Sequence, residues 1–286
     1  MDNKTETILS NKTFLVTGAG HGIGLALATE LDSLNVNLIL VDIDEISLRE
    51  VSESLQQSPL CMSFDVSEES AWKDAKTEIN TYLTENAISK ISGIINNAGI
   101  AHDSILTENM NHQHFKRIMD VNFYGVLLGT ETFLPTLKNQ KHAWIVNVSS
   151  IFGSTGIGKL NAYCSSKFAV KGLTESLRME SKAYFPNITV CLVQPGGIQT
   201  DIANRALQVE QDNEVKRKQE IKTFNKQLRT SPQRAAKTIV AGIINNQERV
   251  LIGADAKLMD ILTRLMPVKY TTLFLKYIQK AGLLND

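Results

Sequence analysis

The segment Thr13–Gly24, TFLVTGAGHGIG, decides the fold of this 286-residue chain. Its first five residues are apolar or β-branched and predict a short buried strand over 13–17. Gly18, Gly22 and Gly24 then permit a tight turn and a close approach of the backbone to a bound group. An apolar helix is expected directly afterwards, and the N-terminus of a helix favours an anion. A strand, a glycine-rich turn and a helix in this order, at the first turn of the chain, therefore indicate a dinucleotide site whose pyrophosphate lies on the helix N-terminus.

The alternation of strand and helix continues along the chain, without an internal repeat or a low-complexity linker. It predicts an α/β fold, a three-layer Rossmann-type doubly wound parallel sheet of about seven strands in a single domain. Strands are expected at 13–17, 37–41, 60–64, 91–95, 143–148, 188–193 and 250–252. Helices are expected at 23–34, 45–57, 67–85 (capped by Ser67), 114–137 and 160–184, with another beginning at Pro232 after a Ser231 cap.

Two segments depart from this rhythm. Residues 201–230 carry a charged run, VEQDNEVKRKQEIK, which is either a solvated helix face or a mobile lid over a site at the strand ends. Residues 255–286 form a C-terminal extension with apolar residues at roughly helical spacing and interspersed lysine and arginine. We expect a catalytic and dinucleotide-binding domain over 1–254. The extension is expected to pack on that domain or on a partner subunit, with contact to a membrane interface as the alternative.

Composition excludes several classes of protein. Lysine plus arginine and aspartate plus glutamate balance at 30 each, so no global positive field attracts nucleic acid. The polar N-terminus, MDNKTETILSNKT, lacks the apolar core of a signal peptide, and no run approaches the ~18 apolar residues of a membrane span. The three cysteines, Cys61, Cys164 and Cys191, stand far apart and fit a reducing compartment. A cytoplasmic protein is expected. The histidines show no metal-ligand spacing, so no metal site is expected.

Asp42 stands at the end of the second predicted strand. A carboxylate there accepts hydrogen bonds from the adenosine ribose hydroxyls and repels a 2′-phosphate, which favours NAD over NADP. Capping of the next helix is the structural alternative for this residue. No lysine or arginine lies at positions 19–23 or 43–46 to attract the phosphate.

Tyr163 and Lys167 lie four residues apart in NAYCSSK and share one face of the expected helix. An ammonium near a phenol favours the phenolate. Taken alone, the pair favours a surface tyrosine and a solvated lysine on an ordinary helix.

The motifs taken together resemble the classical short-chain dehydrogenase/reductase family, over roughly residues 10–200. They are TGxxxGIG from Thr17, NNAG at 96–99, Asn122, Ser149-Ser150, Tyr163-x-x-x-Lys167, and Pro195-Gly196 with Thr200, in one order. The resemblance changes the interpretation of the Tyr163–Lys167 pair from a helix surface to a proton-transfer device.

The resemblance implies four catalytic residues. Tyr163 is the general acid/base. Lys167 lowers its pKa and holds the nicotinamide ribose. Ser150, thirteen residues before the tyrosine, binds the substrate oxygen as it gains negative charge. Asn122 holds a water in a proton relay to Lys167, or is simply a polar residue on a helix face.

The resemblance also implies a set of cofactor-binding residues. They comprise the glycine turn, the acidic end of the second strand, the pair after the third strand, the turn after the fourth and the loop after the sixth. The residues are Gly18, Gly20, His21, Gly22, Ile23, Gly24, Asp42, Ile43, Asp65, Val66, Asn97, Ala98, Gly99, Tyr163, Lys167, Pro195, Gly196, Ile198 and Thr200.

Five residues near these motifs are candidates for the substrate pocket: His102, Phe152, Ile157, Asn161 and Gly197. Their largely apolar character favours an uncharged, lipophilic substrate. The sequence thus predicts an NAD-dependent enzyme that interconverts a secondary alcohol and a ketone, as a homodimer or homotetramer. The alternatives are a non-catalytic NAD(H)-binding regulatory or scaffold protein and an NADP-dependent ketoreductase.

Overall fold

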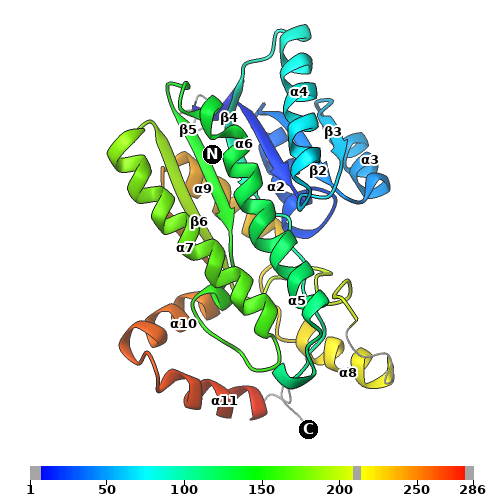
Figure 1. Cartoon of the computed structure of the whole chain (residues 1–286), viewed down its shortest axis with the longest axis vertical. Helices are drawn as coiled ribbons and strands as arrows, with labels where there is room; N and C mark the ends of the chain where they lie inside the picture. Colours follow the sequence, from blue (N-terminus) through cyan, green and yellow to red (C-terminus); the bar gives the residue numbers. More distant parts are fainter. Residues whose placement is uncertain (1–7, 209–213, 281–286) are drawn as a thin grey trace.

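One seven-stranded parallel sheet forms the centre of the molecule (Figure 1). The structure is a computed structural model that describes residues 8–208 and 214–280. The strand order is β3-β2-β1-β4-β5-β6-β7, so the order reverses between β1 and β4. In such a sheet the crevice for a ligand opens at the carboxyl ends of the strands, at this reversal. The strands are β1 (Thr13–Thr17), β2 (Asn37–Asp42), β3 (Leu60–Ser63), β4 (Ile91–Asn96), β5 (Ala143–Val148), β6 (Ile188–Pro195) and β7 (Arg249–Ile252).

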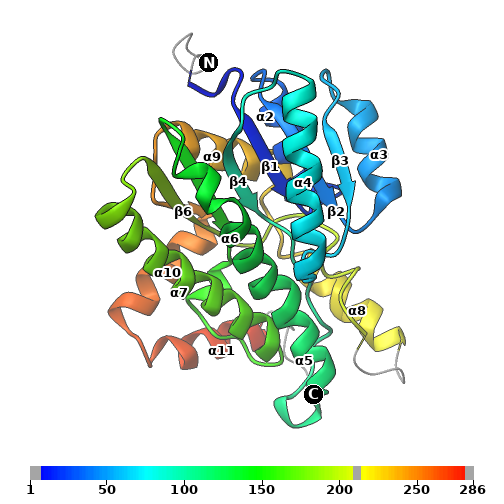
Figure 2. The same cartoon turned by 45° about the horizontal axis from the view of Figure 1, so that its top comes forward.

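Helices cover both faces of the sheet (Figures 1 and 2), which confirms the predicted three-layer fold. One hydrophobic cluster joins the sheet to α2 (Gly22–Asp32), α3 (Glu45–Ser54) and α9 (Pro232–Ile244). The other joins it to α4 (Glu69–Glu85), α6 (Gly125–Leu137) and α7 (Asn161–Tyr184). The remaining helices are α5 (His112–Met119), α8 (Glu214–Asn225), α10 (Ala254–Leu265), α11 (Tyr270–Lys280) and short 3₁₀ turns at Thr107–Asn109 and Ile151–Gly153.

The helix expected over 114–137 differs from its prediction in one physically informative way. It is divided by a π-helical turn at Asp120–Tyr124, which lies between α5 and α6. A π turn bonds residue i to i+5 and so adds one residue to a helical turn. Asn122 therefore lies at an irregularity of the helix, where such turns are frequent at functional sites.

Ser67 does not cap α4, so that prediction was wrong. The N-cap is Glu68, and α4 begins at Glu69. The Ser67 hydroxyl and N–H both donate to Asp65 Oδ1, at 2.7 and 3.0 Å. These two bonds form an Asx-type turn. The Ser67 hydroxyl bonds to Asp65 and not to the first N–H groups of α4, because short polar side chains often form such local bonds in place of a helix cap. Ser231, in contrast, caps α9 as expected, with Pro232 at the first helical position.

The C-terminal extension forms α10 and α11, and polar contacts join it to the domain. Tyr270 Oη accepts from Gly156 N–H at 3.2 Å, the Asp255 carboxylate accepts from Gly197 N–H at 2.6 Å, and Asp260 accepts from Arg249. Much of the apolar surface of these helices nevertheless stays exposed. Among the helices of the described residues, none is long and apolar enough to cross a bilayer.

Gly93 in β4 lies beneath the ring of Phe14, a fully buried residue of β1. A Cβ at Gly93 would lie 2.2 Å from Phe14 Cε1. The Phe14 ring also packs against Trp144 of β5, with ring centroids 5.6 Å apart, so it has little room to move. The glycine is therefore required by core packing.

Gly93→Ala should lower the free energy of unfolding by about 1–3 kcal/mol, because the extra methyl overpacks the core. Gly172→Ala is the matched control: Gly172 is exposed on α7 and a Cβ there meets no atom within 4 Å. That change should leave stability unaltered or raise it by about 0.5–1 kcal/mol. Urea unfolding of both variants measures the effect. Equal midpoints for the two would show that the Phe14 ring yields freely.

Candidate functional site

The glycine turn between β1 and α2 has the backbone geometry that a bound anion requires. Gly18 and Gly22 have φ of +65° and +53°, values that side chains disfavour. A Cβ on Gly22 would lie 3.0 Å from Thr200 Cγ2, so glycine lets the turn pack closely against the loop after β6. His21, the N-cap residue of α2, turns its ring to Asp44 at 3.1 Å and does not cover the first amides of the helix. Those amides lack intrahelical partners and are suited to a phosphate. The residues present fit the pyrophosphate of a dinucleotide.

Thr17 ties this turn to the end of β4. Its hydroxyl accepts from the N–H groups of Asn97 and Ala98, both at 3.0 Å. The Asn97 amide in turn donates to the carbonyls of Thr17 and Gly18, at 2.9 and 3.2 Å. Asn97 therefore fixes the backbone at the end of β1, where the glycine turn begins.

Asp42 lies at the C-terminal end of β2, beside the glycine turn. Its carboxylate accepts from Gly20 N–H at 2.8 Å and from Asp44 N–H at 3.0 Å. A Cβ on Gly20 would lie 3.0 Å from Asp42 Oδ2, so only glycine allows this approach. Asp42 is held by the backbone, remains partly exposed, and fits hydrogen-bond donors such as ribose hydroxyls. Ile43 is 63% exposed beside it.

Asp44, which the sequence analysis did not select, caps α3 and lies next to Asp42. Hydrogen bonds from Ser47 and His21 hold the pKa of Asp44 well below its usual range. Arg205, from the segment after β6, lies 3.8 Å from Asp44 Oδ2. A cation therefore does reach the ribose end of the site from 160 residues further along the chain, which no local window of sequence reveals.

Asp65 and Val66, the pair after β3, are largely engaged within the protein. Asp65 pairs with Arg117 of α5 at 2.6 Å and accepts from Ser67. Burial alone would raise the pKa of Asp65, but the Ser67 and Arg117 hydrogen bonds lower it. The Val66 side chain is 7% exposed, and its carbonyl accepts from Trp72 Nε1.

Tyr163 and Ser150 form the centre of the candidate site. Ser150 follows β5, and its Oγ accepts from Phe152 N–H at 3.1 Å. Tyr163 lies in the first turn of α7. Burial raises the pKa of Tyr163 to about 12, and the nearby Ser150 hydroxyl opposes that rise. Ser149 faces elsewhere and donates to the carbonyl of Lys167 at 2.8 Å.

Lys167 lies one turn along α7 from Tyr163. It is 3% exposed, and its Nζ lies 5.7 Å from the centroid of the Tyr163 ring. Nζ donates to the carbonyl of Val148 at 3.1 Å. Burial lowers the pKa of Lys167 to about 8. The structure therefore brings the two residues together as the i, i+4 spacing predicts.

Asn122, in the π turn, is fully buried, and its side chain is fixed on both sides. Its Oδ1 accepts from Ile100 N–H at 2.8 Å, and its Nδ2 donates to the Ile100 carbonyl at 2.9 Å and to Ser166 Oγ at 3.0 Å. These bonds fasten the loop after β4 to α7. The side chain is thus a bridge between two elements that carry the site.

Gly99 packs closely against Lys167 and Asn122. A Cβ at Gly99 would lie 3.2 Å from Lys167 Nζ and 3.3 Å from Asn122 Oδ1, which is tighter than side chains normally pack. Glycine therefore lets the backbone after β4 approach the polar atoms of both residues.

The loop after β6 closes the other side of the site. Gly196 N–H donates to the Ile252 carbonyl at 2.9 Å, and the Gly197 carbonyl accepts from the N–H groups of Arg229 and Thr230. Ile198 is buried at 6% exposure. Asp255 of α10 holds Gly197, and a Cβ at Gly196 would collide with that carboxylate. The Pro195–Thr200 loop is therefore fixed from the C-terminal extension, a contact that the sequence analysis missed.

The candidate pocket residues fall in two groups. Phe152, Ile157 and Gly197 lie in the loops that follow β5 and β6, whereas His102 and Asn161 make polar contacts with neighbouring loops. His102 is 3% exposed, its Nδ1–H donates to the Asp103 carbonyl at 2.7 Å, and burial lowers its pKa. Asn161 Nδ2 donates to Thr107 Oγ1 at 3.2 Å.

The segment expected as a lid contains α8 and is docked beside this pocket; residues 209–213 of it lie outside the described residues. Leu207 N–H donates to the Ala101 carbonyl at 2.9 Å, and Asp103 N–H donates to the Leu207 carbonyl at 3.0 Å. Arg217 Nε lies 2.9 Å from both carboxylate oxygens of Asp103. These contacts lie at the edge of the candidate site and consist of hydrogen bonds and an ion pair. Such polar contacts can break and re-form, as the predicted lid requires.

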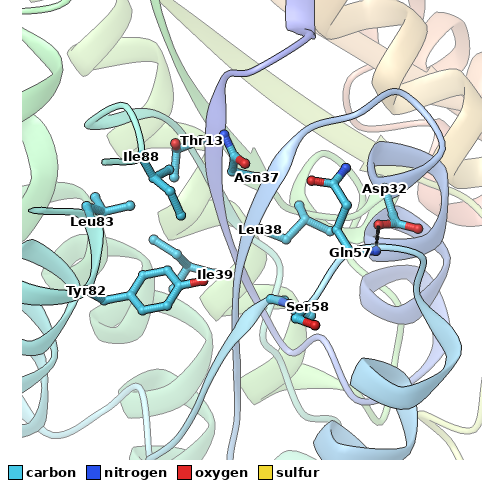
Figure 3. A pocket seen from close by; sticks show the side chains of 11 residues that line it. Thr13, Asp32, Asn37, Leu38, Ile39, Gln57, Ser58, Tyr82, Leu83 and Ile88 are labelled. Carbon is cyan, nitrogen blue, oxygen red and sulfur yellow. Dashed lines mark hydrogen bonds between the residues drawn. The ribbon is translucent and has the colours of Figure 1, made fainter. Parts of the chain in front are cut away.

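A second, small cavity lies at the opposite edge of the sheet (Figure 3). Its volume is ≈ 30 Å³, room for about one water. Thr13 and Asn37, the first residues of β1 and β2, line it, and Asp32 beside them accepts from Gln57 N–H at 3.1 Å. It is a structural pocket, remote from the strand ends that carry Tyr163. In the part of the chain that the structure describes, no three His, Cys, Asp or Glu side chains are grouped to hold a metal ion.

Comparison with known proteins agrees with this geometry. A model of the family described as short chain dehydrogenase matches residues 12–211. A Mycobacterium tuberculosis protein named SadH is 36% identical over 92% of this chain and 93% of its own length. Levodione reductase of Leifsonia aquatica is 30% identical over 84% of this chain and 90% of its own length. A solved short chain dehydrogenase/reductase from Burkholderia phymatum, in complex with NAD, has a TM-score of 0.78 at 23% identity over 90% of this chain and 95% of that one. The chain belongs to the short-chain dehydrogenase family.

Proposed function

We propose that this oxidoreductase interconverts a secondary alcohol and a ketone with NAD as its cofactor, and that Tyr163 is its general acid/base. The observation that carries the proposal is the pairing of Tyr163 with Ser150, with the buried ammonium of Lys167 5.7 Å from the centroid of the tyrosine ring. A phenol, a hydroxyl and a cation in this arrangement suit proton transfer to an oxygen that gains or loses charge.

Ser150 and Tyr163 bind the reacting oxygen of the substrate from one side. In alcohol oxidation Tyr163 Oη accepts the hydroxyl proton, and Ser150 Oγ donates to the oxygen as negative charge develops. When bound, NAD supplies the hydride acceptor. In ketone reduction the same atoms act in reverse, and Tyr163 returns the proton.

Proton transfer near neutral pH requires a lower Tyr163 pKa than burial alone gives. A Tyr163 pKa of about 12 keeps the phenol protonated near neutral pH. The positive charge of Lys167 lowers that pKa through space, and the cationic nicotinamide ring adds to the effect. Lys167 and Asn122 both lie against Gly99, and in the proposed relay a water held beside Asn122 exchanges protons with Lys167, while Lys167 also holds the nicotinamide ribose.

The substrate is proposed to be uncharged and lipophilic. Phe152, Ile157 and Ile198 contribute apolar surface near Tyr163. Two relatives bear names that fit an alcohol or a ketone: levodione reductase, and estradiol 17-beta-dehydrogenase 11 of Rattus norvegicus, which is 26% identical over 93% of this chain and 84% of its own length. The proposed assembly is a homodimer or homotetramer in the cytoplasm.

An NADP-dependent ketoreductase is the second candidate, and Arg205 is the observation that favours it. Its guanidinium lies at the ribose end of the site, where a 2′-phosphate would need a cation. Asp44 already neutralises it, and Asp42 adds a second carboxylate. NAD therefore remains the proposed cofactor.

Tyr163→Phe should reduce turnover of a secondary alcohol by about 10²–10⁴-fold and leave NADH binding intact, because only the proton-transfer group is lost. Tyr184→Phe, the same change at a residue 81% exposed at the end of α7, should keep full activity. Steady-state rates and a fluorescence titration with NADH measure both properties. Retained turnover would remove Tyr163 from its role, and a wild-type protein that binds NADH without turning over any alcohol or ketone would favour the non-catalytic alternative.

Asp42→Asn should strengthen NADPH binding by about tenfold and change NADH binding less, because a like-charge contact with the 2′-phosphate is removed while hydrogen-bond acceptance is kept. Asp74→Asn, on the exposed surface of α4, is the control and should change neither. Separate fluorescence titrations with NADH and NADPH give the two dissociation constants. If the wild type binds NADPH more tightly than NADH, the ketoreductase is the correct function.

Lys167→Met should stabilise the fold at pH 7 while activity is lost. The folded pKa of about 8 is below the ordinary 10.5, so the unfolded chain binds more protons between those values and stability rises with pH. Below pH 8 the full cost of burying the charge is present, about 3 kcal/mol by proton linkage.

Urea unfolding at pH 7 and pH 10 checks the sign. The stability of the wild type relative to the Lys167→Met variant should rise between pH 7 and pH 10, whereas Lys171→Met on the same helix should show no such change relative to the wild type. The comparison is made between variants because the raised thiol pKa values of Cys61, Cys164 and Cys191 lower the stability of every form alike over this range. An unchanged pH dependence in the variant would mean that the buried Nζ is compensated by its bond to Val148.

A further inference from the structure

The outer surface of α10 and α11 combines exposed apolar side chains with exposed cations. We propose that this tail face, residues 254–280, binds peripherally to the surface of an anionic lipid bilayer. The inference does not depend on the redox chemistry proposed above, because it rests on the surface alone.

The apolar part of the tail face is large and ordered along the helix. Leu258, Ile261 and Leu265 of α10 are 58%, 53% and 75% exposed, and their spacing of three and four places them on one side of the helix. Val268, in the bend after α10, is 76% exposed. Leu273 and Leu275 of α11 are 49% and 43% exposed on different sides of that helix, because they are two residues apart. The one-sided exposed stripe of α10 is of the kind that marks an interaction site.

The charge of the tail face has one sign. Lys257, Arg264, Lys269, Lys276 and Lys280 are all exposed. The two carboxylates of the segment are engaged with the domain: Asp260 with Arg249 and Arg264, and Asp255 with Gly197 N–H. On α10 the cations lie beside the apolar stripe, so their long stems can follow it while the ammonium and guanidinium groups meet lipid phosphates.

This charge distribution favours lipid over a second copy of the chain. In a two-fold dimer the same patch meets itself, so the exposed cations would face their own equivalents with no free carboxylate of the tail face to offset them. An anionic headgroup layer offers the opposite charge, and each lysine or arginine near it strengthens binding about fivefold. Because no helix of the described chain can span a bilayer, the contact is interfacial.

The position of the tail face gives the contact a use. Figures 1 and 2 show α10 and α11, in orange and red, at the end of the molecule where α7 begins. Tyr270 and Asp255 hold Gly156 and Gly197, in the two loops next to Tyr163. A bilayer under the tail face would lie close to the candidate pocket and could deliver a lipophilic molecule directly to it.

Vesicle flotation of the full-length protein tests the proposal. The wild type should float with vesicles of phosphatidylcholine and phosphatidylserine and stay unbound with phosphatidylcholine alone. Leu258→Ser with Leu265→Ser should reduce flotation at least tenfold, because two apolar anchors are lost. Ile46→Ser with Met179→Ser is the matched control, since those residues are 72% and 75% exposed on α3 and α7 and should have no effect. Lys269→Gln with Lys276→Gln should reduce flotation more than tenfold and weaken its salt dependence, because three of the five exposed cations remain.

Light scattering after gel filtration, on the same samples, distinguishes binding of lipid by the tail face from binding of a second copy of the chain. Unchanged mass together with lost flotation in the Leu258 and Leu265 variant supports the bilayer. Absence of wild-type flotation, equal flotation of this variant and the wild type, or a variant that dissociates a larger wild-type assembly without any lipid effect would each overturn the proposal. Thermal melting confirms that each variant is folded.

Discussion

The hydroxyl of Thr17 is the contact on which the rest of the site depends. It accepts two backbone N–H groups from the chain after β4, at the point where the strand order reverses. The approach is possible because Gly18 has no side chain: a Cβ there would lie 2.8 Å from Ala98 Cα. The glycine turn and the closely packed Gly99 thereby share one rigid frame. A cofactor bound as proposed would meet the turn at one end and Lys167 at the other.

The sequence predicted all seven strands and the residues that meet at the site, because strands, glycine turns and the Tyr163–Lys167 spacing are local patterns. The sequence analysis missed two ion pairs between residues that are far apart in the chain, and it missed the π turn. Arg117 reaches Asp65 from 52 residues away, and Arg205 reaches Asp44 through a loop, so no short window contains either pair. The π turn was not predicted because the pattern of apolar and polar residues over five positions is too short to distinguish a π turn from a turn of α-helix.

Burial acts on Tyr163 and Lys167 in the same sense: it favours the uncharged form of each. The free protein therefore keeps the Tyr163 phenol protonated, and burial of the Lys167 ammonium costs stability. A ligand that brings charge or hydrogen bonds to these groups would offset that cost, which links ligand affinity to the stability of the fold.

The π turn at Asp120–Tyr124 has a consequence for how this region can evolve. An additional residue rotates everything before it by about 100° about the helix axis relative to everything after it. With that rotation α5 packs against α7 while α6 packs against β4. Loss of a single residue would restore a regular helix, yet it would turn α5 away from α7 and carry Asn122 off Ser166. A one-residue deletion in the π turn is therefore expected to disrupt both the packing of α5 and the position of Asn122.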